Sequence, residues 1–184
     1  MDALEALINR VSAPRLREPA PTAEQREQLF RAALRAPDHG QLRPWRFLTI
    51  EGEGRQQLGE LFAQAVAENA PGEEALAKAR AMPLRAPLLV VAIARVQSHF
   101  KVPQEEQVIA AGCAAHAIIL AAYAQGIGAV WRTGDMAYNP LVAAGLGLSE
   151  GEQIVGYLYL GTPERELRAV PQVNVADFVS RWPN

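Results

Sequence analysis

The sequence predicts an α+β domain in which helices pack on a layered β-sheet. Predicted strands and helices alternate without the strict βαβ rhythm of a doubly wound fold. Residues 88–94, LLVVAIA, are continuously apolar and follow Pro87, which is typical of a strand covered on both faces. Residues 104–125 form a long helix that is apolar nearly all round and therefore expected to be buried. The 184 residues fit one domain spanning 1–184, which should bury about 70% of its unfolded surface.

Composition excludes several classes of protein. Apolar residues make up 49% of the chain and charged residues 21%, as in soluble globular proteins. The net charge of −2 does not indicate a nucleic-acid or anionic membrane partner. A lone cysteine, Cys113, excludes an intrachain disulfide and suits a reducing compartment. The N-terminus lacks the apolar core of a signal peptide, and residues 108–124 are too rich in Ala and Gly to indicate a membrane span. We therefore expect a cytoplasmic protein.

In the first half of the chain, capping signals set the helix starts. Asp2 with Glu5, and Thr22 with Gln25, are capping-box pairs that begin helices over residues 2–10 and 22–36. The second helix must end there because Pro37 follows. Three prolines make residues 12–21 a loop. The alternating WRFLTIE predicts a strand that begins at Trp45, GEGR predicts a turn, and helices are expected over residues 55–69 and 73–82.

In the second half, a loop precedes the long helix, and a strand, a short helix and another strand follow it. Gly126 ends the helix as a typical C′ residue, and Pro140 begins a short helix as its first residue. Residues 96–102 are a polar loop, AVWRT and QIVGYLYLG are strands, and residues 140–146 are the short helix. The tail from residue 162 to 184 has scattered apolar residues and no amphipathic helix. We expect it to be an arm that covers its own domain or a partner.

Common catalytic motifs are missing from the sequence. Its histidines, His39, His99 and His116, are far apart, and zinc usually needs three or four ligands. Cys113 and His116 lie three residues apart on one helix, and both are expected to pack in the core. Neither a phosphate-binding loop, a dinucleotide-binding glycine motif nor the hydrolase motif G-x-S-x-G is present. We predict no metal site.

Three groups of residues at the ends of elements are candidates for ligand binding. Each combines a planar cation or a hydroxyl donor with a place where backbone N–H groups are unpaired. Singly, such groups are more often ordinary surface features; together they suggest an anionic ligand with a phosphate and a polyol chain. The groups are Arg10 with Ser12, Arg35 with His39, and Trp131 with Arg132 and Thr133.

The sequence resembles the FMN-dependent nitroreductase family, in particular its short YdjA-type branch. The resemblance rests on ALINRVSAPRLREPAPT, RAPDHGQLRPWRF, GCAAHAIILAAYAQGIGAVWRTG and IVGYLYLGTP, which occur in the family's order and spacing. It implies an α+β fold with a mixed, mostly antiparallel sheet flanked by helices, and a homodimer with an extended C-terminal arm. It further implies two FMN molecules at the dimer interface and ping-pong transfer of electrons from NAD(P)H to nitroaromatic, quinone or similar acceptors.

The resemblance also implies which residues contact the cofactors. Arg10 and Arg132 are candidates for the FMN phosphate, Ser12 and Thr133 for phosphate or ribityl oxygens, and Arg35 or His39 for the flavin edge. The implied FMN contacts are Arg10, Val11, Ser12, Arg35, His39, Trp131, Arg132 and Thr133, and the implied NAD(P) contacts are Ala121, Ala122, Tyr123, Ala124, Gln125 and Gly126. No catalytic side chain is expected, because the hydride chemistry belongs to the cofactor.

Departures from the family pattern leave alternatives open. Val11 stands where many relatives carry a second basic residue, and Gln41 and Arg43 stand where the wider family often has Asn and Gln. A flavin-binding storage or sensor protein without significant turnover is one alternative. Oxygen-dependent chemistry on the flavin and a structural domain without a cofactor are two others. The electron acceptor and the choice between NADH and NADPH do not follow from the sequence.

Overall fold

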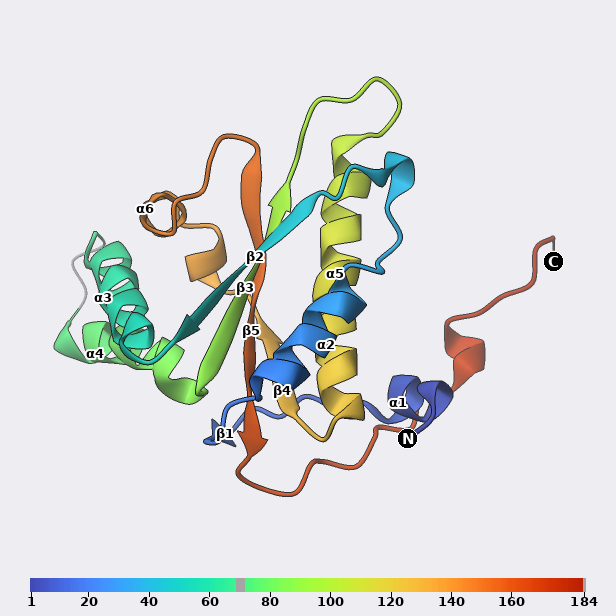
Figure 1. Cartoon of the computed structure of the whole chain (residues 1–184), viewed down its shortest axis with the longest axis horizontal. Coiled ribbons are helices and arrows are strands. Elements are labelled where there is room, and N and C mark those ends of the chain that lie inside the picture. The colour runs from blue at the N-terminus through green and yellow to red at the C-terminus, as the bar shows by residue number, and fades with distance from the viewer. Residues whose placement is uncertain (69–71, 184) are drawn as a thin grey trace.

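A computed structural model describes residues 1–68 and 72–183 (Figure 1). The α-helices are α1 (Ala3–Asn9), α2 (Ala23–Ala33), α3 (Glu53–Ala67), α4 (Glu73–Ala81), α5 (Gln104–Ala124) and α6 (Pro140–Gly145). The strands are β1 (Leu16–Arg17), β2 (Trp45–Glu51), β3 (Leu88–Arg95), β4 (Gly128–Arg132) and β5 (Glu152–Pro163). Short 3-10 turns are η1 (His39–Gln41), η2 (Met82–Arg85), η3 (Asp135–Ala137) and η4 (Val175–Asp177).

The sheet has the order β1-β5-β3-β2, and β4 also pairs with β5. Strand β3 lies in the interior between β2 and β5, and its residues are buried except for Arg95, which confirms the central strand predicted from LLVVAIA. A mixed sheet was expected, but the pairings among the described strands are all antiparallel. The prediction of an α+β layered architecture with a mostly antiparallel sheet is confirmed.

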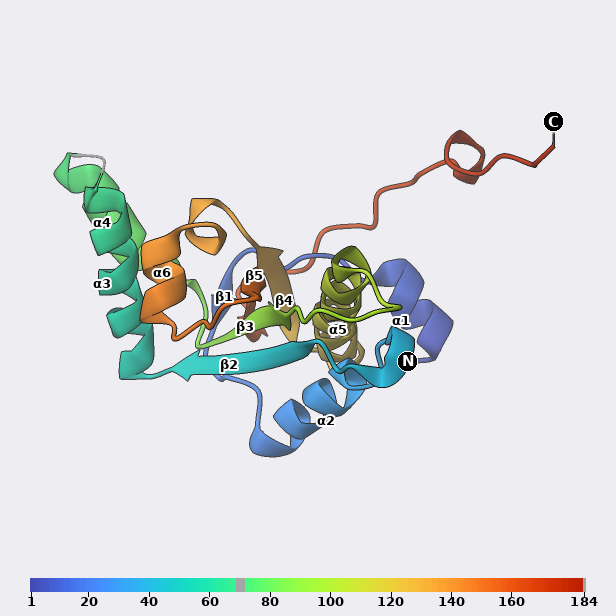
Figure 2. The same cartoon turned by 90° about the horizontal axis from the view of Figure 1, so that it is seen from above.

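Two apolar cores lie on the two faces of the sheet. Side chains of β3 alternate between them, as the two-residue period of a strand requires. Leu89, Val91 and Ile93 join the core beneath α3, α4 and α6, whereas Leu88 and Val90 join the core beneath α2 and α5. Figure 2 shows these helix groups on either side of the strands. The sheet is thus the shared middle layer.

The capping residues predicted from sequence form the expected bonds. Asp2 accepts a hydrogen bond from the Glu5 N–H at 2.8 Å, and Thr22 Oγ1 accepts one from the Gln25 N–H at 3.2 Å. Pro140 begins α6, and Gly126 follows α5 with a φ of 73°. Local sequence therefore determines where these elements begin and end.

Three element predictions were wrong in detail. The expected loop over residues 12–21 contains the strand β1, because Leu16 and Arg17 pair with the end of β5. Helix α3 begins at Glu53, inside the predicted turn, since Gly52 makes the turn alone with a φ of 54°. The second helix ends at Ala33, short of its predicted end at residue 36, while the three-residue turn η4 in the tail agrees with the prediction that no amphipathic helix forms there. The predicted end of the helix at Asn69 lies outside the described residues.

Helix α5 is less buried than its composition suggested. Ile109 is 65% exposed and His116 is also exposed, so the prediction that His116 packs in the core was wrong. Cys113 is half-buried. By length and composition alone α5 could cross a membrane, but eight of its residues are buried against the rest of the chain, as in the core helix of a globular protein. The remaining apolar face is not covered by the part of the chain that the structure describes.

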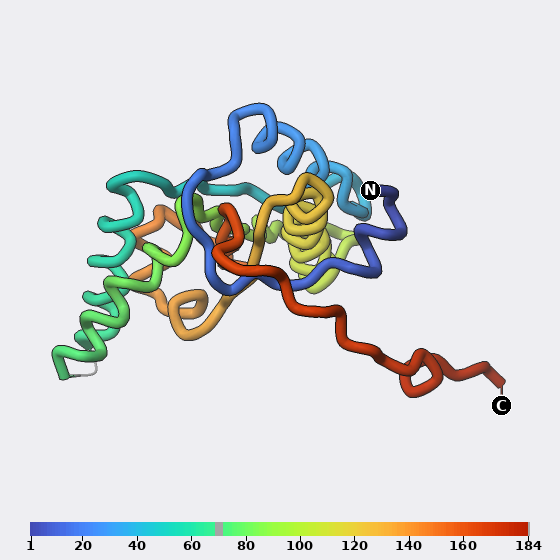
Figure 3. The backbone as a smooth tube through the Cα atoms, turned by 90° about the horizontal axis from the view of Figure 1, so that it is seen from below, coloured from blue at the N-terminus to red at the C-terminus, as the bar shows by residue number. Residues whose placement is uncertain are grey.

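Further exposed apolar groups lie near this face and along the tail. Helix α1 exposes Leu4, Leu7 and Ile8, and it packs beside α5. Figures 1 and 3 show the tail leaving the body of the molecule beyond β5. Its large apolar side chains Val173, Val175, Phe178, Val179 and Trp182 are exposed. The tail is therefore an extended arm, as predicted, in which Leu167 near its start packs against the core of its own domain and the apolar side chains from Val173 onwards are exposed.

Candidate functional site

The segment from Arg10 to Ser12 lies next to the beginning of β4. Arg10 caps α1 by donating its backbone N–H to the Ala6 carbonyl at 3.2 Å, so the chain leaves the helix there. The buried Ala13 then donates to the Ala129 carbonyl on β4 at 2.9 Å. Two of the three predicted groups of ligand-binding residues are thus joined by a hydrogen bond between their neighbours.

Trp131 fills the space between β5 and α5. Its indole Nε1 donates to the Val155 carbonyl at 3.3 Å. A Cβ at Gly156 would lie 2.0 Å from this nitrogen, and one at Gly112 would lie 4.0 Å from the far edge of the ring. Only glycine at position 156 leaves room for the ring. Trp131 therefore fixes the end of β4 from which Arg132 and Thr133 extend.

Arg132 is the most distinctive residue of this region. Its guanidinium lies over the Tyr159 ring, 5.7 Å from the centroid, and burial raises the pKa of Tyr159 above its usual value. The Arg132 Nε is buried and has no hydrogen-bond partner within residues 1–68 and 72–183. An unsatisfied buried donor costs about 1–3 kcal/mol, and more when it is charged. An anionic ligand would satisfy it.

Arg35 and His39 lie apart from the other two groups. Arg35 is exposed just beyond α2, and His39 Nδ1 lies 2.6 Å from Glu106 Oε2 on the first turn of α5. Figures 2 and 3 show η1 and β4 on opposite sides of α5. The structure therefore does not bring Arg35 and His39 together with Arg10 and Arg132 within one chain.

The predicted NAD(P) contacts form the last turn of α5 and its cap. Ala122 is fully buried, and the Gln125 side chain donates to the Ala121 carbonyl at 3.2 Å. The backbone N–H groups of Gln125 and Gly126 already donate to carbonyls of the last turn. The carboxyl end of a helix also carries partial negative charge, which disfavours phosphate. Contacts to a ribose or an amide suit this stretch better than contacts to a pyrophosphate.

Sequence reasoning missed a group of arginines beside Ser12. A cavity of about 200 Å³ is lined by Ser12, Arg15, Arg165 and Arg168, together with Glu166. Arg165 and Arg168 come from the first residues after β5. The sequence feature that could have indicated this group is the charged run RELR, residues 165–168, in an otherwise irregular tail. Guanidinium groups in this arrangement could hold a phosphate.

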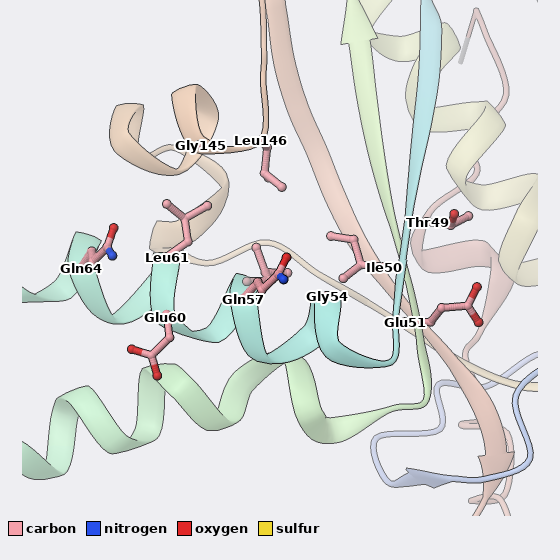
Figure 4. Close-up of a pocket in the computed structure, with 11 residues that line it drawn as sticks. Thr49, Ile50, Glu51, Gly54, Gln57, Glu60, Leu61, Gln64, Gly145 and Leu146 are labelled. Atoms are coloured by element: carbon pink, nitrogen blue, oxygen red, sulfur yellow. The ribbon is translucent and has the colours of Figure 1, made fainter.

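A larger cavity lies on the face of the sheet that α3 and α6 cover, and it fits no predicted ligand. It has a volume of about 510 Å³ and is bounded by β2, α3 and α6 (Figure 4). Its charged side chains are Glu51 and Glu60, which already pair with Arg26 and Arg80. A cavity lined by acids would repel a phosphate. We do not assign the functional site to it.

The geometry can be compared with known proteins. The sequence profile of the nitroreductase family matches residues 9–162. The chain belongs to the nitroreductase family. It is 48% identical over 177 residues to "Putative NAD(P)H nitroreductase YdjA" of Escherichia coli K12, with 96% of both chains covered. It is 40% identical over 185 residues to "Putative NAD(P)H nitroreductase" of Haemophilus influenzae, with 98% of this chain and 99% of the relative covered. The YdjA-type branch inferred from the sequence motifs is thereby confirmed.

Solved structures share the fold of this nitroreductase at lower sequence identity. A nitroreductase-like family protein from Bacillus cereus superposes with a TM-score of 0.84 at 23% identity, covering 100% of this chain and 97% of the other. A mutant of the FMN and NADPH-dependent nitroreductase NfnB from sphigopyxis sp. strain HMH gives a TM-score of 0.77 at 18% identity and covers both chains fully. At these identities the likeness establishes the fold.

Proposed function

We propose that this nitroreductase-family protein is an FMN-dependent NAD(P)H oxidoreductase. The observation that carries the proposal is the buried Nε of Arg132, which has no hydrogen-bond partner among the described residues and lies on β4, the strand whose Ala129 is hydrogen-bonded to Ala13. The names of the Escherichia coli and Haemophilus influenzae relatives indicate NAD(P)H as the electron donor, and that of NfnB indicates FMN. A single FMN-binding domain over residues 1–184, in the cytoplasm, is part of the proposal.

The donors around β4 suit FMN. Arg10 and Arg132 would neutralise the phosphate dianion, with Ser12 and Thr133 donating to phosphate or ribityl oxygens. Val11 can offer only its backbone. When bound, FMN accepts a hydride from NAD(P)H and passes electrons by a ping-pong mechanism to a nitroaromatic, quinone or similar acceptor. Trp131 holds these donors in place through its contacts with β5 and α5.

A homodimer would complete the site. Arg35 and His39 are predicted flavin contacts, yet η1, which contains His39, and β4, which ends at Arg132, lie on opposite sides of α5 (Figures 2 and 3). A second copy packed on the exposed apolar faces of α1 and α5 could supply them. There they would donate to the flavin edge on which negative charge develops during reduction. The arm from residue 163 to 183 could span up to about 70 Å when extended, which is enough to cross a partner of this size.

The end of α5, residues 121–126, remains the proposed contact for the nicotinamide nucleotide. Ala124 and Gly126 are its exposed members. Because this is the carboxyl end of a helix, we propose that it meets the neutral part of the nucleotide, and that phosphates bind to arginines elsewhere. Substitution at Ala124 by Glu should then raise the KM for NAD(P)H and leave flavin affinity unchanged.

The visible absorption spectrum tests the proposal directly. The protein, purified and incubated with FMN, should retain a flavin band after desalting. A protein that shows no flavin band after this treatment does not have the proposed function.

A flavin-binding storage or sensor protein is the second candidate. It is favoured by Val11, which stands where many relatives supply a basic group. Stopped-flow mixing with NADH and NADPH separates the candidates, because rapid bleaching of the flavin indicates an enzyme. A bound flavin that neither nucleotide bleaches indicates the storage or sensor role.

A further inference from the structure

The loop before β2 holds Arg43 in an unusual backbone conformation. Gln41 has a φ of 54° and Arg43 a φ of 49°, in the left-handed region that favours glycine. The Asp38 carboxylate stabilises this shape by accepting the backbone N–H groups of Leu42 at 3.1 Å and Arg43 at 2.7 Å. The Arg43 carbonyl in turn accepts the Trp45 N–H at 2.8 Å. Strained residues kept in place by their surroundings often lie at functional sites.

Arg43 lines a cavity together with another arginine. This cavity has a volume of about 630 Å³, and its lining includes Arg35, Asp38, Gln41, Arg43 and Trp45. Within the described part of the chain, neither guanidinium makes a side-chain hydrogen bond or an ion pair. Both carboxylate oxygens of Asp38 are already used by the loop backbone. The cavity is therefore lined by two guanidinium groups without ion-pair partners and by one carboxylate that already accepts two backbone hydrogen bonds.

A neighbouring cavity is lined by both arginines and glutamates. Arg43 and Arg95 line it, but Glu150 and Glu152 line it too, and its volume is about 250 Å³. Glu152 there is held by Arg46, with two nitrogen–oxygen distances of 2.7 Å. In that cavity Glu152 pairs with Arg46 and Arg95, whereas Arg43, which lines both cavities, forms an ion pair in neither within the described residues, and Asp38 is the one carboxylate lining the cavity that it shares with Arg35.

We propose that Arg43 and Arg35 bind an anionic group of a substrate of this enzyme. Two guanidinium groups can hold a phosphate or carboxylate through paired hydrogen bonds, which makes the cavity a specificity site. The proposal rests on the proposed function, because Arg35 is also a predicted flavin contact and so links the cavity to the flavin. The same chemistry fits two sources, the 2′-phosphate of NADPH and a carboxylate on the electron acceptor.

Calorimetry with inorganic phosphate tests the anion site without turnover. Phosphate is titrated into the protein with excess FMN present, so that a flavin phosphate site is filled if the chain has one. Arg43→Gln should weaken phosphate binding about tenfold, and Arg43→Lys should recover part of it. Arg31→Gln is the matched control, because Arg31 lies on α2 and pairs with Glu27. Absence of binding to the unmodified protein, or equal loss in the Arg31 and Arg43 variants, would overturn the proposal.

Steady-state kinetics then identify the source of the anion. If the site holds the 2′-phosphate, Arg43→Gln raises the KM for NADPH about tenfold and leaves that for NADH unchanged. If it holds an acceptor carboxylate, the KM for 4-nitrobenzoate rises and that for 4-nitrobenzamide does not. In both cases kcat stays near its original value. Unchanged KM values in both pairs would refute the assignment to a substrate.

The two kinds of failure are distinguishable. A protein that binds no flavin has lost the proposed function and with it the role in substrate specificity, while calorimetry still decides whether Arg43 binds an anion. A flavoprotein that reduces acceptors but binds phosphate equally well with and without Arg43 retains the proposed function and refutes this inference.

Discussion

The two faces of the sheet differ in how far their helices are covered by the chain itself. On the face of α3, α4 and α6, side chains and backbone meet closely: Phe62 packs edge-on to Tyr157 at 5.5 Å, and a Cβ at Gly59 would lie 2.5 Å from the Arg80 carbonyl oxygen. On the side of α5 and α1, Ile109 is 65% exposed and α1 exposes Leu4, Leu7 and Ile8. The core of the first face is covered by its own chain, and the buried Arg132 Nε beside Tyr159 is the polar atom there that has no partner among the described residues. The second face has the composition of a surface that binds a partner.

Removing a side chain from the complete face should have the largest effect. Phe62 is 1% exposed, so Phe62→Ala leaves a cavity and should lower the free energy of unfolding by about 3–5 kcal/mol. Phe100→Ala is the matched control, since Phe100 is 95% exposed, and it should change stability by less than about 0.5 kcal/mol. Urea unfolding measures both. Similar losses in the two variants would contradict the view that the first face is a closed core.

A charge on the open side should separate the proposed dimer. Ile109→Asp places a carboxylate on the exposed face of α5, and burying it between two copies should weaken association by at least about 100-fold. Leu84→Asp is the control, because Leu84 is 47% exposed on η2, which packs against α3 and α4 and not against α5. Analytical ultracentrifugation reads the result. A monomeric unmodified protein, or an Ile109 variant that associates normally, would remove this face from the interface.

The two arginines predicted to hold the FMN phosphate should matter for the ligand more than for the fold. Arg10→Ala and Arg132→Ala should each weaken FMN binding by about 1.5–3 kcal/mol, the scale of a charged hydrogen bond. Arg80→Ala, which removes an exposed arginine paired with Glu60 on the closed face, should leave flavin affinity unchanged. Fluorescence titration of FMN gives the affinities. Equal affinity in all three variants would reject Arg10 and Arg132 as phosphate ligands.

The sequence predicted the closed parts of the molecule better than the open ones. The capping pairs at Asp2 and Thr22, the central strand and the start of β2 at Trp45 were confirmed, because each depends on local chemistry or on burial by its own chain. The exposure of His116 was missed. Apolar composition shows that a helix face will be covered, but not whether its own chain or another one covers it.

Long-range placement was also beyond the sequence. Strand β1 forms only because Leu16 and Arg17 meet the end of β5, some 145 residues later, and two residues carry no strand periodicity. The unpaired Nε of Arg132 and the left-handed backbone of Arg43 depend on the finished fold in the same way. The resemblance nominated Arg132 as a ligand contact, while the structure adds a physical reason for it.

The smallest expected effect concerns the sheet that both faces share. Glu152 on β5 accepts two hydrogen bonds from Arg46 on β2, both at 2.7 Å, and one from the Ser149 N–H at 3.0 Å. These bonds, chiefly those from Arg46, lower the pKa of Glu152 from 4.5 to about 2. Because the folded pKa lies below the unfolded one, the stabilisation is complete above pH 4.5 and is lost as the pH falls towards 2.

Acid titration of stability isolates this contribution. Between pH 5 and pH 2, the unmodified protein should lose about 2 kcal/mol more unfolding free energy than Glu152→Gln, after allowance for solvent screening. Glu150→Gln is the control, since it keeps the pair with Arg46 and should keep the original pH dependence. Chemical unfolding at each pH measures the difference. The flavin affinity of the folded protein should be unchanged in both variants, because the ion pair of Glu152 and Arg46 joins strands and is not among the predicted flavin contacts. A Glu152 variant with weakened flavin binding would show that the shared sheet and the flavin site are coupled.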